Sequence, residues 1–181
     1  MTDLTIPDAS PVTATVRLAA AGDQAAFASL VNEHHASMAR VAYAITGNTD
    51  AAADAVQAAW TIAWRRLGAL RDHASVRAWL VAIAANEARQ AIRRQGGRVV
   101  VDISSTPDVA GRGDPADRIS TLDLARVLRT LKPDDRTLLA LRYVAGLDSS
   151  EIAAQLGGSA SGVRSRLSRL AERLRMELDH D

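Results

Sequence analysis

Residues 149–170 constrain the fold more than any other part of the chain, because two helical patterns meet there at a pair of glycines. The first pattern, 149–156, carries a short apolar stripe of the kind that one face of an α-helix buries. Gly157 follows it directly, and glycine adopts a left-handed conformation at a helix C-terminus at the lowest cost. Ser159 can then cap a second helix, 159–178, by accepting a hydrogen bond from one of its first amides. The stretch therefore predicts two helices joined by a tight turn.

The second of these helices has an apolar face and a polar face. Its apolar residues recur at steps of four, three, four and four positions, which aligns them on the side that faces a core. These residues are Val163, Leu167, Leu170, Leu174 and Leu178. Small serines lie roughly opposite and arginines flank them, as is typical of a DNA recognition helix whose central side chains contact bases and whose outer arginines contact phosphates. The candidate DNA-binding residues are Ser159, Ser161, Arg164, Ser165, Arg166, Ser168 and Arg169. The alternative interpretation is a basic helix face that is only solvated.

Composition favours a helical protein. The chain has 181 residues, enough for one medium domain or two small ones, and it is rich in alanine, the best helix former. The absence of cysteine excludes disulfides and thiolate metal sites. No apolar run approaches the ~20 residues of a membrane span, and the polar, acidic start does not resemble a secretory signal. We therefore expect an all-α, cytoplasmic protein.

The net charge of +1 hides a basic centre. Residues 61–100 contain eight arginines against two acidic residues and sum to +6, whereas residues 1–60 sum to −4. Lys132 is the only lysine, so nearly all the positive charge is guanidinium, which forms bidentate contacts with phosphates and bases. The middle of the chain can therefore supply the cations that a nucleic-acid backbone requires.

Helix signals divide residues 13–97 into four expected helices. They are a short helix over 13–21, a second from an Asp23 cap to Gly47, a third capped by Asp50, and a fourth over 76–94 capped by Ser75. Trp60 and Trp64 of the third helix and Trp79 of the fourth fall on apolar faces. We therefore expect the three tryptophans to pack in the core rather than to stack on bases.

A change of composition separates the two halves of the chain. Residues 98–116 combine glycines, prolines and short polar residues without a helical period, so they predict a flexible linker. Four helices are expected beyond it, over 117–131, 133–145, 149–156 and 159–178. Pro133 suits the first turn of its helix, where Asp134 and Asp135 favour the positive end of the helix dipole. The expected organisation is a disordered extension over 1–12 and two small helical domains, 13–97 and 117–181, joined by the flexible linker.

No arrangement of residues predicts catalysis or a cofactor. His34 and His35 are neighbours, so their rings point to different helix faces and cannot share a metal as histidines four positions apart do. The sequence contains no phosphate-binding glycine loop with a lysine and no nucleophile motif. We therefore expect a protein that is not an enzyme and that has no cofactor and no metal.

Two blocks of sequence carry a family resemblance. The first, within 18–94, includes Gly22-Asp23-Gln24-Ala25-Ala26-Phe27, Asp54-Ala55-Val56-Gln57, Ala63-Trp64-Arg65 and Arg77-Ala78-Trp79-Leu80. The second, within 119–175, includes Leu141-Arg142-Tyr143-Val144-Ala145-Gly146-Leu147, Glu151-Ile152-Ala153, Leu156-Gly157 and Val163-Arg164-Ser165-Arg166-Leu167. Together they resemble the extracytoplasmic-function sigma factors, the minimal two-domain members of the sigma-70 family. A helix-turn-helix alone is shared by many families, whereas both blocks in this order, with a linker between them, are specific.

The resemblance implies an alternative sigma factor that binds the β and β′ subunits of core RNA polymerase and directs promoter-specific transcription initiation. The first domain would be region 2, which docks on polymerase and opens the −10 element, and the second would be region 4, whose recognition helix reads the −35 element. The residues that match polymerase-facing positions are Asp54 and Gln57. Those that match −10 positions are Arg71, His73, Ser75, Arg77, Asn86, Arg89, Arg93 and Arg94. The implied partners are core polymerase, promoter DNA and an anti-sigma factor, without insertion into a membrane.

The chain departs from the family pattern at several positions. Ala53 and Ala58 stand where the polymerase-facing segment usually has acidic residues, and the loss of a charge-assisted bond at each would weaken docking by roughly 1–3 kcal/mol. Gly158 replaces a branched apolar residue in the turn, and Gly162 replaces a threonine in the recognition helix. Two further functions therefore stay open: a stand-alone helix-turn-helix regulator, and a sigma-derived interaction module with weakened polymerase docking.

Overall fold

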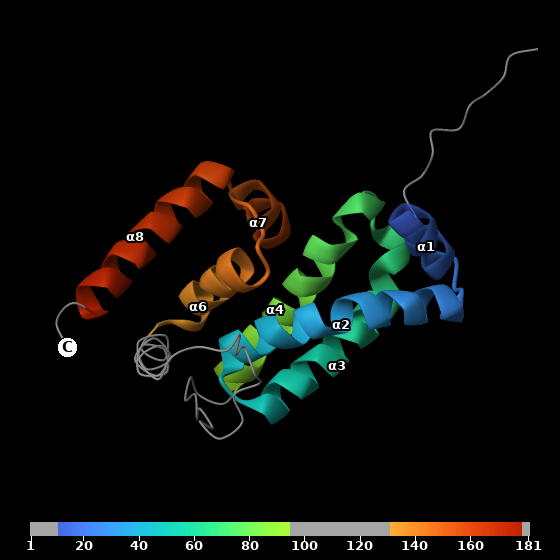
Figure 1. The fold of residues 1–181 in the computed structure, drawn as a ribbon, viewed down its shortest axis with the longest axis horizontal. Coiled ribbons are helices and arrows are strands. Elements are labelled where there is room, and N and C mark those ends of the chain that lie inside the picture. Colours follow the sequence, from blue (N-terminus) through green and yellow to red (C-terminus); the bar gives the residue numbers. More distant parts are fainter. Residues whose placement is uncertain (1–10, 95–130, 179–181) are drawn as a thin grey trace, which may run out of the picture.

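The computed structural model describes residues 11–94 and 131–178, and every regular element in these two ranges is helical (Figure 1). The first range contains α1 (Pro11–Ala20), α2 (Gln24–Thr46), α3 (Thr49–Arg66), the 3-10 turns η1 (Leu67–Ala69) and η2 (His73–Ser75), and α4 (Val76–Arg94). The second contains α6 (Pro133–Leu139), the π-helical turn η4 (Ala140–Val144), α7 (Ser149–Leu156) and α8 (Ala160–Leu178). The all-α expectation is confirmed. The linker expected over 98–116 and nearly all of the helix expected over 117–131 lie outside the described residues.

Local capping chemistry sets the ends of α2 and α3. Asp23 caps α2, as expected, by accepting a 2.9 Å hydrogen bond from an amide of the first turn. Gly47 ends the helix with a φ of 65°, which glycine adopts without strain. The cap of α3 expected at Asp50 is wrong, because the side chain of Asn48 accepts the capping bond, at 2.8 Å. Asp50 lies in the first turn, where its charge interacts favourably with the helix dipole.

The short turn η2 precedes α4 and changes the role expected of Ser75. The Asp72 carboxylate accepts hydrogen bonds from the Ser75 hydroxyl and from the Ala74 amide. These bonds lower the pKa of Asp72, with the Ser75 hydroxyl contributing most. Ser75 therefore does not act as the expected cap of α4; its hydroxyl turns back and closes the preceding turn.

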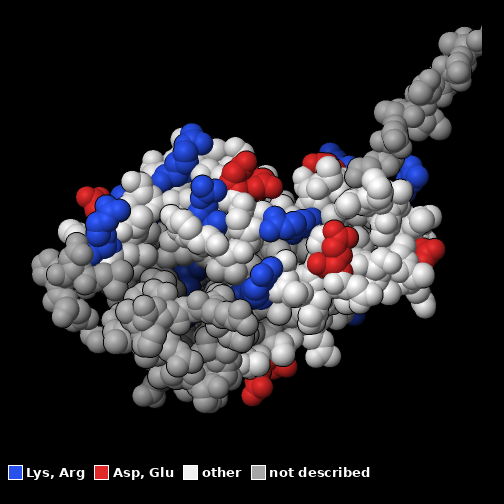
Figure 2. Space-filling view, in the orientation of Figure 1, with Lys and Arg blue, Asp and Glu red and all other residues white. Residues whose placement is uncertain are grey.

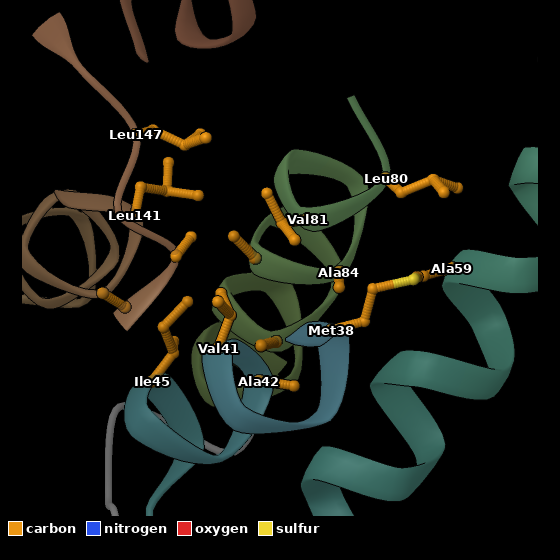
Figure 3. Close-up of a cluster of buried hydrophobic side chains, with 14 of the residues drawn as sticks. Met38, Val41, Ala42, Ile45, Ala59, Leu80, Val81, Ala84, Leu141 and Leu147 are labelled. Carbon is orange, nitrogen blue, oxygen red and sulfur yellow. The ribbon is translucent and has the colours of Figure 1, made fainter. Parts of the chain in front are cut away.

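Helices α2, α3 and α4 pack around the core of the first domain. Met38 of α2 is fully buried and lies between Ala59 of α3 and Ala84 of α4 (Figure 3). Leu80 of α4 is also buried, at 1% exposure. The alanines at these contacts permit a short distance between the helix axes, because that distance depends on the side chains that meet there.

The three tryptophans differ in their exposure. Trp60 and Trp79 are half-buried against the core, as expected. Trp64 is 42% exposed, which corrects the expectation that it packs inside. Phe27 of α2 contacts Trp60 and Trp64 edge to face, with ring centroids 5.6 and 4.8 Å apart. One face of Trp64 is therefore held by the aromatic contact that joins α2 to α3.

The first described helix of the second domain changes type along its length. Pro133 stands in the first turn of α6 together with Asp134 and Asp135, as expected. The regular helix expected to continue to residue 145 is wrong, because α6 ends at Leu139 and the chain proceeds as the π-helical turn η4. In this turn the Ala145 amide donates to the carbonyl five residues earlier, at 3.0 Å.

Helices α7 and α8 form the predicted helix-turn-helix. Asp148 starts α7 with a capping box. Gly157 ends it with a φ of 76°, and the Ser159 hydroxyl caps α8 by accepting a 3.1 Å bond from an amide of the first turn. Leu167 and Leu170 of α8 are buried, and the other described members of its apolar stripe are half-buried. The two helices, their turn and their core-facing side are thus confirmed.

The two domains share one apolar core. Leu141 and Leu147 of the second domain lie against Val41 and Ile45 of α2 and Val81 of α4 (Figure 3). All five side chains are 0% exposed, and burying one such side chain is worth about 1.5–3 kcal/mol. The second domain is therefore packed onto α2 and α4 through an apolar contact.

His34 is a titratable side chain inside this packing. It is 5% exposed, and its Nε2 has no hydrogen-bond partner among the described residues. Burial lowers the pKa of His34 below the ordinary 6.5, and Arg77 adds to this effect. Glu33, whose carboxylate lies 3.9 Å from Nε2, acts in the opposite direction.

We expect acid to destabilise the protein through His34. Because the folded state holds the pKa below that of the unfolded chain, the stabilising contribution is complete above the ordinary value of 6.5 and is lost as the pH falls through the folded value. Urea unfolding at pH 7.5 and 5.5 measures the loss, which is expected to be smaller in His34→Leu and unchanged in Asn32→Gln, an exposed change on the same helix. Identical pH dependence in His34→Leu and the wild type would contradict this assignment.

The buried Leu80 provides a direct test of the first-domain core. Leu80→Ala is expected to lower the free energy of unfolding by about 2–5 kcal/mol, because it removes buried methyl groups and leaves a cavity. Leu18→Ala on α1 is the matched control, since Leu18 is 52% exposed and the change is expected to cost at most ~0.5 kcal/mol. Urea unfolding followed by circular dichroism compares the two, and similar losses would place Leu80 outside the core.

Candidate nucleic-acid interface

The outer face of α8 carries the residues expected to contact DNA. Ser161, Ser165 and Ser168 are exposed, as are Arg164 and Arg169. Arg169 donates to the carbonyl of Ser165 at 3.3 Å, which directs its side chain along the helix. Figure 2 shows basic side chains over α8 and in the middle of this view, where the two domains meet. The helix thus presents small polar groups with a guanidinium on either side, and the cap residue Ser159 is exposed at its start.

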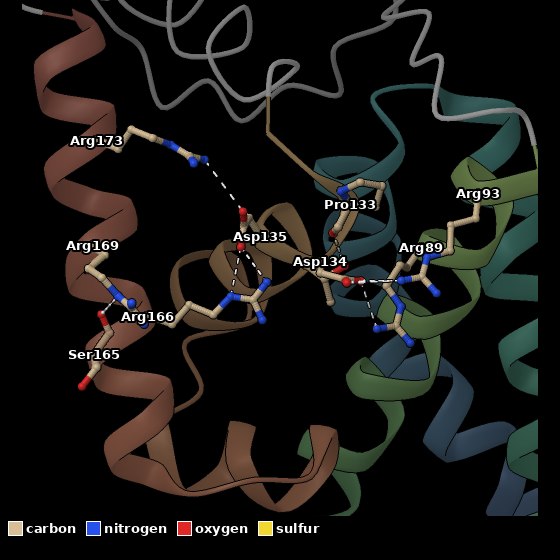
Figure 4. A network of polar contacts seen from close by, with 10 residues as sticks. Arg89, Arg93, Pro133, Asp134, Asp135, Ser165, Arg166, Arg169 and Arg173 are labelled. Atoms are coloured by element: carbon tan, nitrogen blue, oxygen red, sulfur yellow. Dashed lines mark hydrogen bonds and ion pairs between the residues drawn. The ribbon is translucent and has the colours of Figure 1, made fainter.

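Arg166 differs from its neighbours because it is ion-paired inside the domain. Its Nε and Nη2 donate to Asp135 Oδ1 at 3.0 and 2.6 Å (Figure 4). Arg173 lies 3.8 Å from the other carboxylate oxygen. The Asp135 side chain is only 12% exposed, so the two arginines neutralise a largely buried charge. Arg166 therefore fixes α8 to α6.

On α4, Arg89 and Arg93 face the first turn of α6. Arg89 Nη1 lies 3.2 Å and Arg93 Nη2 3.1 Å from Asp134 Oδ1 (Figure 4). Arg89 also donates to the side-chain oxygen of Asn86 at 2.7 Å. Three of the residues expected at the −10 element are thus brought into one network, and its acidic member belongs to the other domain.

Arg77 makes a separate contact between the domains. Its guanidinium donates to the Ala145 carbonyl, at the end of η4. The last carbonyls of a helix have no partner within the helix, and they carry partial negative charge. Arg77 therefore satisfies and stabilises the C-terminal end of the π-helical turn.

The remaining candidates for −10 contact lie apart from this network. Arg71 and Arg94 are exposed and form no ion pair within 11–94 and 131–178, while His73 and Ser75 are half-buried in η2. The loop and the α4 network are therefore two distinct groups of candidate residues rather than one continuous cluster.

The candidate polymerase-binding residues lie on the exposed side of α3. Asp54 and Gln57 are three positions apart, so they share one helix face, and both are exposed. Ala53 is exposed and Ala58 is half-buried on the same helix. Neither alanine fills the core, so this surface has room for the acidic side chains that it lacks.

A third charged residue beside the aspartates of α6 was not singled out by the sequence pattern. Arg136 is 4% exposed and donates to the carbonyls of Ile45, at 2.7 Å, and Leu131, at 3.3 Å. Burial lowers its pKa. The pattern assigned Asp134 and Asp135 to the helix dipole alone, whereas each forms ion pairs with other helices. The available signal was a run of three charges that a single threonine separates from the buried pair Leu138–Leu139.

In residues 11–94 and 131–178 no group of three or more histidine or acidic side chains could hold a metal ion. None of the helices in these ranges is long and apolar enough to cross a membrane.

Arg166 and Arg164 are expected to differ in their effect on stability. Arg166→Ala removes both bonds to Asp135 and is expected to lower the free energy of unfolding by ~1 kcal/mol, because Arg166 is itself partly exposed. Arg164→Ala changes an exposed side chain and is expected to stay within ~0.5 kcal/mol of the wild type. Thermal and urea unfolding measure both. A larger loss in Arg164→Ala would reverse these assignments.

Each half of the chain matches a known protein-family model. The family model for Sigma-70 region 2 matches residues 30–98, and that for Sigma-70, region 4 matches residues 121–174. The two matches together cover more than half of the chain. They correspond to the domain built on α2–α4 and to the domain that carries the helix-turn-helix.

Similar proteins extend over nearly the whole chain. RNA polymerase sigma factor NccH of Alcaligenes xylosoxydans xylosoxydans is 33% identical over 92% of this chain and 94% of its own length. ECF RNA polymerase sigma factor SigL of Mycobacterium tuberculosis is 31% identical over 91% of this chain and 96% of its own. The probable sigma factor RfaY of Xanthomonas campestris is 33% identical over 88% of this chain, which spans 42% of that longer protein.

Solved structures agree with these relatives. CnrH in complex with the cytosolic domain of CnrY superposes with a TM-score of 0.71 at 28% identity, over 96% of this chain and 99% of that one. RpoE in complex with the anti-sigma factor NepR, from Bartonella quintana, has the same fold, with a TM-score of 0.68 at 24% identity over 86% of this chain and 98% of that one. Sigma factors are subunits of RNA polymerase that bind core enzyme and promoter DNA without being enzymes themselves. With a region 2 and a region 4 in this order, the chain belongs to the extracytoplasmic-function (ECF) sigma-70 family and directs transcription initiation by RNA polymerase.

Proposed function

We propose how the surfaces of this ECF sigma factor divide the work of initiation. The outer face of α8 reads the −35 element, the η2 loop and α4 hold the −10 element, and the exposed face of α3 docks on core polymerase. The observation that carries the proposal is the exposed row of serines on α8, flanked by arginines and positioned by a capped glycine turn. Side chains of this size and charge suit base edges in the centre and phosphates at the sides.

Within α8, we assign different roles to arginines that are neighbours in the sequence. Arg164 and Arg169 are the phosphate or base contacts, because both are exposed. Arg166 is a positioning residue, because its bonds to Asp135 set the orientation of α8 relative to α6. The serines Ser161, Ser165 and Ser168 then face the groove. Ser159 is assigned to the phosphate backbone at the start of the helix.

In region 2, the −10 element contacts two groups of residues. Arg71, His73 and Ser75 lie in or beside the η2 loop, where an extruded base can be held. The α4 group supplies cations for the backbone. Its cations are Arg77, Arg89, Arg93 and Arg94, and the neutral Asn86 is assigned to the extruded base.

Polymerase docking is assigned to Asp54 and Gln57 on α3. Both side chains are exposed and directed to one side of the helix, which leaves them accessible to a large partner. Of the three acidic positions that the family resemblance implies here, the chain keeps only Asp54, because Ala53 and Ala58 are uncharged. We therefore propose that docking is weaker than in relatives that keep the acidic residues.

We further propose that the factor acts in the cytoplasm under the control of an anti-sigma protein. The support is the similarity to CnrH and RpoE, which were solved with the cytosolic domain of CnrY and with the anti-sigma factor NepR. The chain itself offers exposed apolar side chains on the second domain, Tyr143 at 66% and Val144 at 41% exposure, where a protein partner can bind.

Run-off transcription with purified core polymerase on a promoter library tests the division of tasks. Arg164→Ala is expected to reduce −35-dependent transcription about 5- to 100-fold, the loss for one specific contact, while core binding is unchanged. Asp54→Ala combined with Gln57→Ala is expected to weaken core binding without changing promoter preference.

Ala53→Asp provides a gain-of-function arm, expected to tighten core binding because it adds a charge beside Asp54. Ala28→Asp, the same change at an exposed position of α2, is the matched control. Equal loss of polymerase affinity in Arg164→Ala and in the α3 variants would contradict the division. Specific duplex binding without polymerase would favour a stand-alone regulator, and inertness towards polymerase would favour an interaction module.

A further inference from the structure

The arginines of α4 that are assigned to promoter DNA are occupied by the chain's own region 4. Arg89 and Arg93 lie 3.2 and 3.1 Å from Asp134 Oδ1, and Arg93 also donates to Oδ2 at 3.2 Å. Asp134 belongs to α6 and lies 45 residues after Arg89 and 41 residues after Arg93 in the sequence. This contact therefore joins region 2, which precedes residues 95–130 in the sequence, to region 4, which follows them.

A carboxylate and a phosphate are alternative ligands for the same guanidinium. Arginine forms paired, charge-assisted hydrogen bonds with either group, in the same planar geometry. The Asp134 side chain is 41% exposed and the Arg93 side chain 58%, so water and ions reach the pair. A DNA phosphate can thus replace Asp134, but both anions cannot use these donors at once.

Two further hydrogen bonds connect the two domains. Arg136 of α6 donates to the Ile45 carbonyl at 2.7 Å, which satisfies an otherwise free carbonyl at the C-terminal end of α2. Arg77 of α4 donates to the Ala145 carbonyl in return. Both arginines therefore bind helix ends that carry partial negative charge.

The centre of the contact is apolar. Leu141 and Leu147 are fully buried against α2 and α4 (Figure 3). Ion pairs of partly exposed side chains contribute little, so the apolar centre supplies most of the attraction. The charged contacts fix the orientation, as is usual at the rim of an interface.

We propose that region 4 is an intramolecular partner of the α2–α4 surface: the free chain is closed, and Asp134 takes the place of a DNA phosphate on Arg89 and Arg93. In the closed form the chain masks part of its own −10 surface. Opening the contact exposes the arginines. The claim that closure masks DNA-binding residues rests on the −10 role proposed for these arginines. The claim that the free chain is closed does not depend on that role.

Distance measurements on the full chain test closure. The sequence has no cysteine, so spin labels can be attached at Ala28→Cys on α2 and Ala154→Cys on α7, both exposed positions. The free chain is expected to give one narrow distance distribution. Asp134→Arg is expected to broaden it, because like charges then face each other. A broad distribution in the parent chain would overturn closure, and a narrow distribution in Asp134→Arg would overturn the role of Asp134.

Reversing the charges on both sides of the contact distinguishes the loss of the ion pair from damage to the fold. Combining Asp134→Arg with Arg89→Glu and Arg93→Glu is expected to restore the narrow distribution. Glu172→Arg, the same change at an exposed acid of α8, is the control and is expected to keep the narrow distribution. Failure of the combined variant to recover, while its circular dichroism stays helical, would overturn the role of Asp134.

Binding of a fluorescent single-stranded oligonucleotide, without polymerase, tests masking. Asp134→Asn is expected to tighten binding about two- to tenfold at low salt, the range for releasing exposed ion pairs. Glu172→Gln corrects for the change in net charge. In the Arg89→Ala, Arg93→Ala background, Asp134→Asn is expected to add nothing beyond this control. Equal effects of Asp134→Asn and Glu172→Gln would overturn masking, and neither result depends on transcription.

Discussion

Three consecutive charged residues in the first turn of α6 orient this helix relative to α2, α4 and α8. Asp134 binds Arg89 and Arg93 of α4, Asp135 binds Arg166 and Arg173 of α8, and Arg136 binds the end of α2 (Figure 4). Neighbouring residues on a helix point about 100° apart, so one turn can reach three different directions. The position of the DNA-reading helix therefore depends on a segment that is itself outside the helix-turn-helix.

This arrangement uses a property of arginine, which is almost the only cation in the chain. A guanidinium can bind a carboxylate, a backbone carbonyl or a phosphate with little change of geometry. Arg166 uses this capacity to fix α8 to α6, while the exposed Arg164, two positions earlier, is open to a ligand. Arg77 and Arg136 use it on helix ends. A lysine offers a point charge and would not replace these forked contacts.

Sequence patterns predicted what depends on local chemistry and missed what depends on distant partners. The caps at Asp23 and Ser159, the glycine ends at Gly47 and Gly157, and the apolar side of α8 all follow from residues within a turn or two. The cap of α3 was expected at Asp50 and lies at Asn48, since asparagine and aspartate both cap helices and the two positions are close in sequence. The π-helical turn has no comparable signal, since Leu141–Leu147 reads as ordinary helix and turn.

For the candidate site, the exposed serines of α8 were predictable from spacing, whereas the ion pair of Arg166 was not, because Asp135 is 31 residues away.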